Sequence, residues 1–81
     1  MIKLRFFGRL GDVASNAPST ISGDYADASE VRRALSEDCP ALGRALREPQ
    51  VMIAIDQSVA DWQTPLPDEC ELAFLPPVTG G

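Results

Sequence analysis

Apolar and polar side chains alternate at the start of the chain, over residues 2–7. Ile2, Leu4 and Phe6 would share one face of an extended segment, whereas Phe7 would lie on the opposite face with two basic residues. A period of two is typical of a strand that buries one side. The pattern therefore predicts a first strand whose even-numbered residues enter the core.

The segment after this strand is predicted to be a loop. Gly8 and Gly11 loosen the chain, and the stretch that ends at residue 19 is rich in polar and turn-forming residues. Residues 20–22 then predict a short second strand, which returns beside the first strand as a hairpin.

A helix is predicted to begin near Asp27, whose carboxylate can accept bonds from the first free backbone N–H groups. Glu30 follows three residues later, as in a capping box, and apolar residues then recur at helical spacing. Pro40 disfavours a helical conformation at the residue before it, so this helix should end near residue 38. Pro40 is also well placed to begin a second short helix, which Pro49 stops.

The remaining strands follow from two apolar segments. Residues 51–55 are apolar at both odd and even positions, which is typical of a central strand covered on both faces. A turn is predicted at 56–58, and Val59 and Trp62 are isolated apolar residues in a connecting stretch. Residues 71–75 alternate again, and the two prolines after them end that strand because they cannot donate to a ladder.

This order of elements predicts an α+β fold, in which a sheet carries one main helix on one face. A length of 81 residues suits a single domain. We expect that domain to span residues 1–75 and to be followed by an extended tail over residues 76–81.

Charge and composition narrow the functional classes. The net charge of −5 disfavours binding to nucleic acid or to an anionic membrane surface. The chain has no His, which removes the usual general base and the commonest metal ligand, so no metal site is expected. Cys39 and Cys70 form no C-x-x-C pair, and we expect ordinary reduced thiols. No signal-peptide or membrane-span pattern is present, which favours a cytoplasmic protein.

The end of the chain is its most unusual feature. Pro76 and Pro77 prefer an extended conformation and stiffen the exit from the last strand. Gly80 and Gly81 carry no side chain, so their backbone can pass through a narrow channel. Residues 76–81 can reach roughly 20 Å at ~3.3–3.6 Å each. The tail is therefore suited to deliver the Gly81 carboxylate into another protein.

Nearly the full length resembles the ubiquitin-like sulfur carriers, specifically the molybdopterin synthase small subunits of the MoaD type. The resemblance rests on the opening Ile2-Lys3-Leu4-Arg5-Phe6-Phe7-Gly8, on Met52-Ile53-Ala54-Ile55-Asp56-Gln57, and above all on Leu75-Pro76-Pro77-Val78-Thr79-Gly80-Gly81. It implies a ubiquitin-like β-grasp fold, with a mixed sheet of about four to five strands.

The resemblance also implies a mechanism. A ubiquitin-activating-like adenylyltransferase would use ATP to adenylate Gly81, and a sulfur donor such as a cysteine desulfurase would supply the sulfur of a Gly81 thiocarboxylate. The carrier would then bind the large subunit, in a heterotetramer of two small and two large subunits, and pass sulfur to cyclic pyranopterin monophosphate. The active site is expected on the large subunit, so the carrier itself would be non-catalytic and hold no cofactor.

A docking surface should lie beside the tail. If the first and last strands are neighbours, Phe7 and Leu75 point to the open face of the sheet, and Arg5 flanks them. Exposed apolar patches rimmed by charge commonly mark partner sites. We expect these residues to bind partners together with the tail residues Pro76, Pro77, Val78 and Thr79, while Gly80 and Gly81 form the reactive end of the chain.

Three other functions remain open. The chain could be a carrier of the thiamine-pathway type, although those are usually shorter and lack the Pro-Pro-Val-Thr segment. It could be a ubiquitin-like modifier whose Gly81 is joined to lysines of target proteins. It could also be a β-grasp interaction module with an inert tail, in which case deletion of Gly81 would change nothing.

Overall fold

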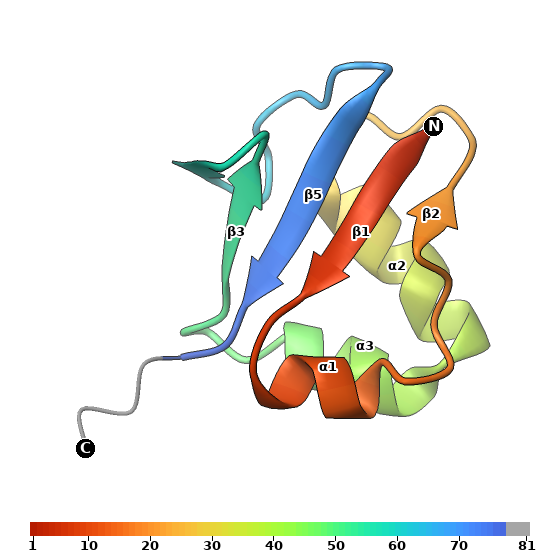
Figure 1. Cartoon of the computed structure of the whole chain (residues 1–81), viewed down its shortest axis with the longest axis vertical. Coiled ribbons are helices and arrows are strands. Elements are labelled where there is room, and N and C mark those ends of the chain that lie inside the picture. The colour runs from red at the N-terminus through yellow and green to blue at the C-terminus, as the bar shows by residue number, and fades with distance from the viewer. Residues whose placement is uncertain (78–81) are drawn as a thin grey trace.

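The computed structural model describes residues 1–77, and its centre is a five-stranded mixed sheet (Figure 1). The strands are β1 (Ile2–Phe6), β2 (Thr20–Ile21), β3 (Met52–Ile55), β4 (Ser58–Ala60) and β5 (Cys70–Leu75). They lie in the order β2-β1-β5-β3-β4, and β1 runs parallel to β5 while the other pairs are antiparallel. The first and last strands are neighbours, and the predicted β-grasp fold is confirmed.

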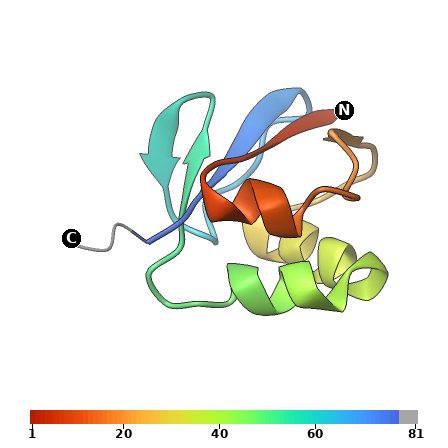
Figure 2. The ribbon, with the colours of Figure 1, turned by 60° about the horizontal axis from the view of Figure 1, so that its bottom comes forward.

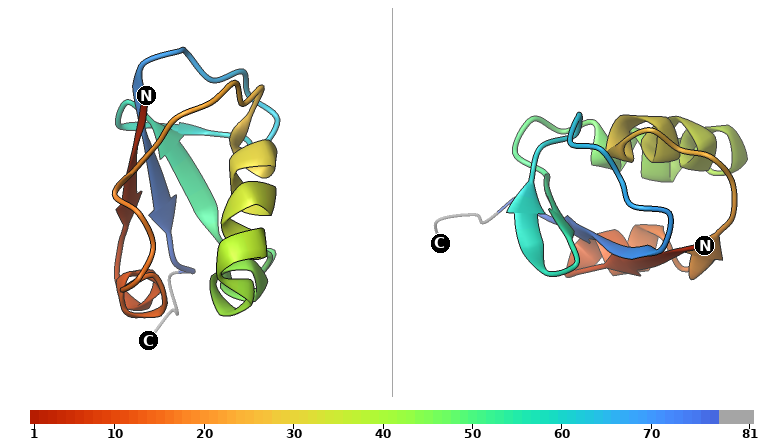
Figure 3. Two further views of the ribbon diagram at one scale, coloured as in Figure 1. Left: turned by 90° about the vertical axis from the view of Figure 1, so that its right-hand side faces the viewer. Right: turned by 90° about the horizontal axis from the view of Figure 1, so that it is seen from above.

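Two helices cover one face of this sheet. The longer is α2 (Ala28–Asp38), and α3 (Pro40–Leu46) follows it directly. Seen from the side and from above, both lie on the same side of the strands, and no described helix covers the opposite face (Figure 3). The predicted main helix and the short helix that begins at Pro40 are both confirmed. The sheet therefore has one covered face and one open face.

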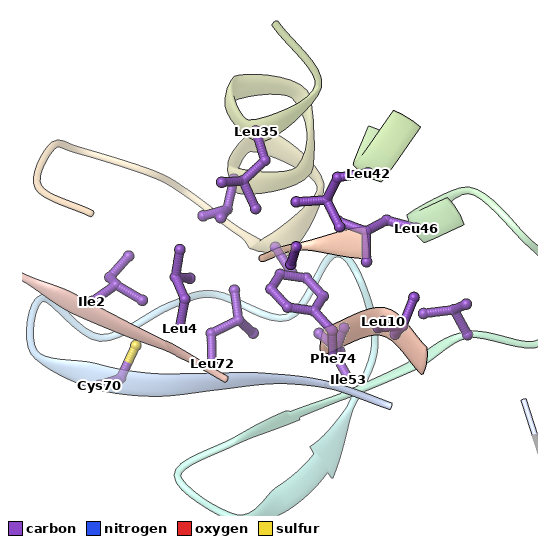
Figure 4. Packing of buried hydrophobic residues seen from close by; sticks show 14 residues of the cluster. Ile2, Leu4, Leu10, Leu35, Leu42, Leu46, Ile53, Cys70, Leu72 and Phe74 are labelled. Atoms are coloured by element: carbon purple, nitrogen blue, oxygen red, sulfur yellow. The ribbon is translucent and has the colours of Figure 1, made fainter. Parts of the chain in front are cut away.

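The core fills the space between the covered face and the helices (Figure 4). Phe74 is fully buried at its centre, and its ring stacks on Phe6 with centroids 5.1 Å apart. Trp62 packs against the core, and its ring centroid lies 6.0 Å from that of Phe74. Four of the predicted inward positions are buried, namely Ile2, Leu4, Leu72 and Phe74, and the fifth, Phe6, is half-buried against the core.

The loop predicted after the first strand is wrong, because this segment contains the short helix α1 (Arg9–Val13). Gly8 turns the chain with a φ of 57°, which a residue with a side chain rarely adopts. Leu10 is then carried into the core, where it is only 3% exposed. That burial offsets the low helix propensity of Gly11, about 1 kcal/mol relative to Ala.

The strand predicted at residues 51–55 does lie inside the sheet, as β3 between β5 and β4, but the prediction that both of its faces are covered is wrong. One face of β3 is open, and it leaves Met52 50% exposed there. The second neighbour of β3 is β4, where only a connecting stretch was expected. Asp56 and Gln57 have φ values of 49° and 70°, so they form a two-residue hairpin turn that folds Ser58–Ala60 back onto β3.

The predicted cap of α2 is present. The Asp27 carboxylate accepts the Glu30 backbone N–H at 3.1 Å and the Ser29 hydroxyl at 2.7 Å. Glu30 in turn accepts the backbone N–H of Ala26 at 2.9 Å. The Ser29 hydroxyl, with smaller help from the backbone N–H groups, lowers the pKa of Asp27.

We expect Asp27→Ala to lower the free energy of unfolding by about 1 kcal/mol near pH 7, because two donors at the start of α2 lose their acceptor. Since the pKa of Asp27 is lowered in the folded state, the ionised cap stabilises the fold above the unfolded value and is lost as the pH falls through the folded value. Urea unfolding of both proteins near pH 7 and near pH 2 should therefore show a gap that shrinks in acid. Asp24→Ala, which removes the same charge from an exposed loop, is the matched control, and an equal loss there would contradict the cap assignment.

Candidate functional site at the root of the tail

The chain leaves the sheet at the edge where β1 and β5 both end (Figures 1 and 2). The backbone N–H of Phe7 donates to the carbonyl of Phe74 at 3.1 Å, so the chain follows β5 for one residue beyond β1. Pro76 then packs against Gly8, where an added Cβ would lie 2.9 Å from the proline Cγ. This contact holds the root of the tail against the end of β1.

Apolar side chains gather on the open face at the same edge. Leu75 is paired with Met52 on β3, and the continuation of β1 places Phe7 on its other side. Phe7 is 42% exposed and Met52 is 50% exposed, while Leu75 is half-buried. We call Phe7, Met52, Val59 and Leu75 the sheet patch.

Two alanines form the floor of the sheet patch. Ala73 pairs with Ala54, and Ala54 pairs in turn with Val59, so these residues share the open face. Val59 is 66% exposed at the far end of this row. Small residues between larger apolar ones give a flat surface, which suits contact with another protein.

Arg5 lies beside the sheet patch, where the sequence placed it. Its guanidinium carbon is 5.6 Å from the centroid of the Phe7 ring, within the range of a cation–π contact. Its Nη1 is also 3.4 Å from a carboxylate oxygen of Glu71. Both contacts are exposed and contribute little to stability. They nevertheless give the patch a charged rim on the β1 side.

The structure describes only the first two residues of the tail. Pro76 and Pro77 are half-buried and continue directly from β5. The predictions for Val78, Thr79, Gly80 and Gly81 lie outside the described residues. The structure thus brings Phe7, Leu75, Arg5 and the two prolines together, and the roles assigned to them stay predictions.

Potential metal ligands, helix length and cysteine reactivity are further features of residues 1–77 that bear on function. No group of three potential metal ligands is present there, and no described helix is long and apolar enough to cross a membrane. Both cysteines are unbonded thiols: Cys39 lies between α2 and α3, and Cys70 begins β5. Burial raises the pKa of the Cys70 thiol, which disfavours the reactive thiolate.

Sequence reasoning missed Met52 and Val59 as members of the patch. The signal for Val59 was the tight Asp56-Gln57 turn, because a two-residue hairpin pairs the residues on either side of it. Met52 required the register between β3 and β5, which the alternation of apolar residues does not determine.

The fold, the sheet patch and the root of a tail whose sequence ends in Gly80-Gly81 can now be compared with known proteins. The model of the ThiS family matches residues 4–81, which is nearly the whole chain. The chain belongs to the ThiS family. Among curated relatives, this ThiS-family chain is 28% identical over 81 residues to the molybdopterin synthase sulfur carrier subunit of Escherichia coli strain K12, and the match covers 100% of both chains.

Solved structures resemble this ThiS-family member over the same length. The crystal structure of SAMP1 from Haloferax volcanii has a TM-score of 0.75 at 25% identity, covering 99% of this chain and 98% of that one. A chain in the complex of subunits 1 and 2 of molybdopterin-converting factor from Helicobacter pylori 26695 has a TM-score of 0.61 at 27% identity. That match covers 99% of this chain and 97% of the other.

Proposed function

We propose that this chain is the sulfur-carrier subunit of molybdopterin synthase and that Gly81 carries the sulfur. The observation that supports this most is the root of the tail: β5 leaves the sheet beside an apolar patch and leads, through two prolines, to a sequence that ends in Gly80-Gly81. Full-length similarity to a protein named as that subunit in Escherichia coli favours the same pathway.

The proposed chemistry begins with activation of the Gly81 carboxylate. A carboxylate is a poor electrophile, so an adenylyltransferase joins it to the α-phosphate of ATP and releases pyrophosphate. The terminal sulfur of a persulfide donor then attacks the acyl carbon and displaces AMP. Cleavage of the remaining S–S bond by a thiol leaves a thiocarboxylate on Gly81. ATP, activating enzyme and sulfur donor meet in the cytoplasm, which is where we place the carrier.

In the second stage the carrier with a thiocarboxylate on Gly81, called the charged carrier below, binds the large subunit. The complex is a heterotetramer of two small and two large subunits. The sheet patch supplies the contact area, while the tail enters the active site of the large subunit. There the thiocarboxylate sulfur attacks cyclic pyranopterin monophosphate, and water releases the Gly81 carboxylate. A dithiolene holds two sulfurs, so two charged carriers are consumed for each product. A neighbouring subunit in the Helicobacter pylori complex supports such a partner.

A second function, attachment to protein lysines, is favoured by a different observation. SAMP1 of Haloferax volcanii, which has the same fold over nearly the same length, is named a small archaeal modifier protein. Both functions need an activated Gly81, but they differ in the molecule that reacts with it in the last step. A lysine amine would form an isopeptide bond, whereas the pterin precursor would take only the sulfur.

The two functions are separated by following the fate of the charged carrier. We expect thiocarboxylated protein, supplied as the sole sulfur source to the large subunit and the pterin precursor, to yield the dithiolene product and return to the carboxylate form. The product is measured by fluorescence after oxidation, and the carrier by intact mass. Uncharged carrier is the control. Covalent carrier–lysine adducts without any dithiolene product would instead favour the modifier.

A further inference from the structure

Basic residues are concentrated on the helical side of an acidic chain. Four of the seven Lys and Arg residues fall between positions 32 and 47, although the net charge is −5. Arg32 and Arg33 belong to α2, Arg44 belongs to α3, and Arg47 follows the end of α3. We call these four residues the helix arginine cluster. The helices that carry it cover the face opposite the sheet patch (Figure 3).

Close packing of the two helices brings these side chains near one another. Gly43 of α3 is buried against α2, and a Cβ added there would collide with Ser36. A hollow of about 360 Å³ is lined by Arg32, Arg33 and Arg47, together with the start of α2. A second hollow of about 220 Å³ lies along α3. Because Arg47 lines both, the two hollows are neighbours, and between them they are lined by all four arginines.

None of the ion pairs within residues 1–77 includes a member of the helix arginine cluster. Those pairs join the N-terminal amine to Glu69, Arg5 to Glu71 and Arg9 to Glu48. Asp27 and Glu30 line the larger hollow, but their carboxylates accept the hydrogen bonds that cap α2. The four positive charges therefore lie together without an opposite charge bound to them.

Arg32 is the least exposed member of the cluster. Its guanidinium carbon lies 4.4 Å from the centroid of the Trp62 ring, and the side chain is half-buried. Burial, with a smaller effect from the charge of Arg47, lowers the pKa of Arg32. An anionic group at this position would relieve the repulsion between the two arginines. Since stacking already fixes Arg32, binding there would cost less side-chain entropy.

We propose that the helix arginine cluster is a second interaction surface, which binds an extended acidic segment of a partner protein. The guanidinium fork matches a carboxylate in two parallel hydrogen bonds. Four arginines spread over two neighbouring hollows can pair with several carboxylates along a chain, whereas one compact anion would occupy a single hollow. A partner bound here would leave the sheet patch and the root of the tail at Pro76 accessible, because the patch lies on the other face and Pro76 packs against Gly8 at the end of β1.

Trp62 is the single tryptophan of the chain and reports directly on this surface, through its contact with Arg32. We expect a glutamate-rich synthetic peptide to change Trp62 fluorescence saturably, and to shift backbone amide NMR signals of α2 and α3. The same peptide with Gln in place of Glu should not bind. Arg33→Gln and Arg47→Gln, both at exposed positions, should each weaken binding about tenfold, and added salt should weaken it further.

Arg5→Gln is the matched control, since it removes one positive charge from the opposite face. Circular dichroism checks that each variant is folded. No saturable response to the peptide would overturn the proposal, and so would equal weakening by Arg5→Gln. Tighter binding of inorganic phosphate or of a single-stranded oligonucleotide than of the peptide would also overturn it. Deletion of Gly81 should leave this binding unchanged, so its outcome is separate from that of the sulfur-carrier proposal.

Discussion

Phe7→Asp and Leu75→Asp are each expected to leave the domain folded and to weaken binding to the large subunit by about 2–4 kcal/mol, or roughly 30- to 700-fold. Both side chains lie on the open face where the tail begins, and neither is fully buried in the isolated domain. A partner that covers this face would lose an apolar contact and would have to desolvate the new carboxylate. Isothermal titration with the purified large subunit measures the loss.

Val13→Asp is the matched control for these two changes. Val13 is 37% exposed, close to the 42% of Phe7, but it lies in α1 rather than on the open face. We expect it to bind the large subunit normally. Thermal unfolding should show that all three variants keep the fold. Binding that is unimpaired in both Phe7→Asp and Leu75→Asp would reject the sheet patch as the docking surface.

Much of the fold was predictable because its signals are local. The alternation in β1 and β5 identified their buried sides, and the Asp27 cap and Pro40 fixed where the two main helices begin. These features depend on a few neighbouring residues, and the structure agrees with them. The adjacency of the first and last strands came from the family resemblance, and their parallel register confirms it.

What the sequence left undetermined depends on contacts between distant residues. Helix α1 exists because Leu10 finds a place in the core, which no local pattern around two glycines reveals. The apolar run of β3 indicated a strand with two covered faces, yet one face is open and Met52 is exposed there. A Met within an apolar run is predicted to be buried, and only the order of the strands shows that it is exposed. The patch was therefore predicted at Phe7 and Leu75 but not at its β3 and β4 side.

Removal of Gly81 is expected to abolish charging even though the shortened chain still ends in glycine, Gly80. The tail loses one residue of reach, about 3.3–3.6 Å, and the new carboxylate falls short of the adenylating site by that distance. A misplacement of about 1 Å can already lower a rate about 100-fold. The folded domain, the sheet patch and the helix arginine cluster are all unchanged by this deletion, so only the chemistry at the terminus is tested.

The most direct test is the intact mass of the chain after incubation with its activating enzyme, MgATP and a sulfur source. We predict a gain that matches replacement of one oxygen by sulfur, present in the complete chain and absent after deletion of Gly81. An unchanged mass, with an activating enzyme that charges another carrier under the same conditions, would contradict the sulfur-carrier account and leave a β-grasp interaction module with an inert tail.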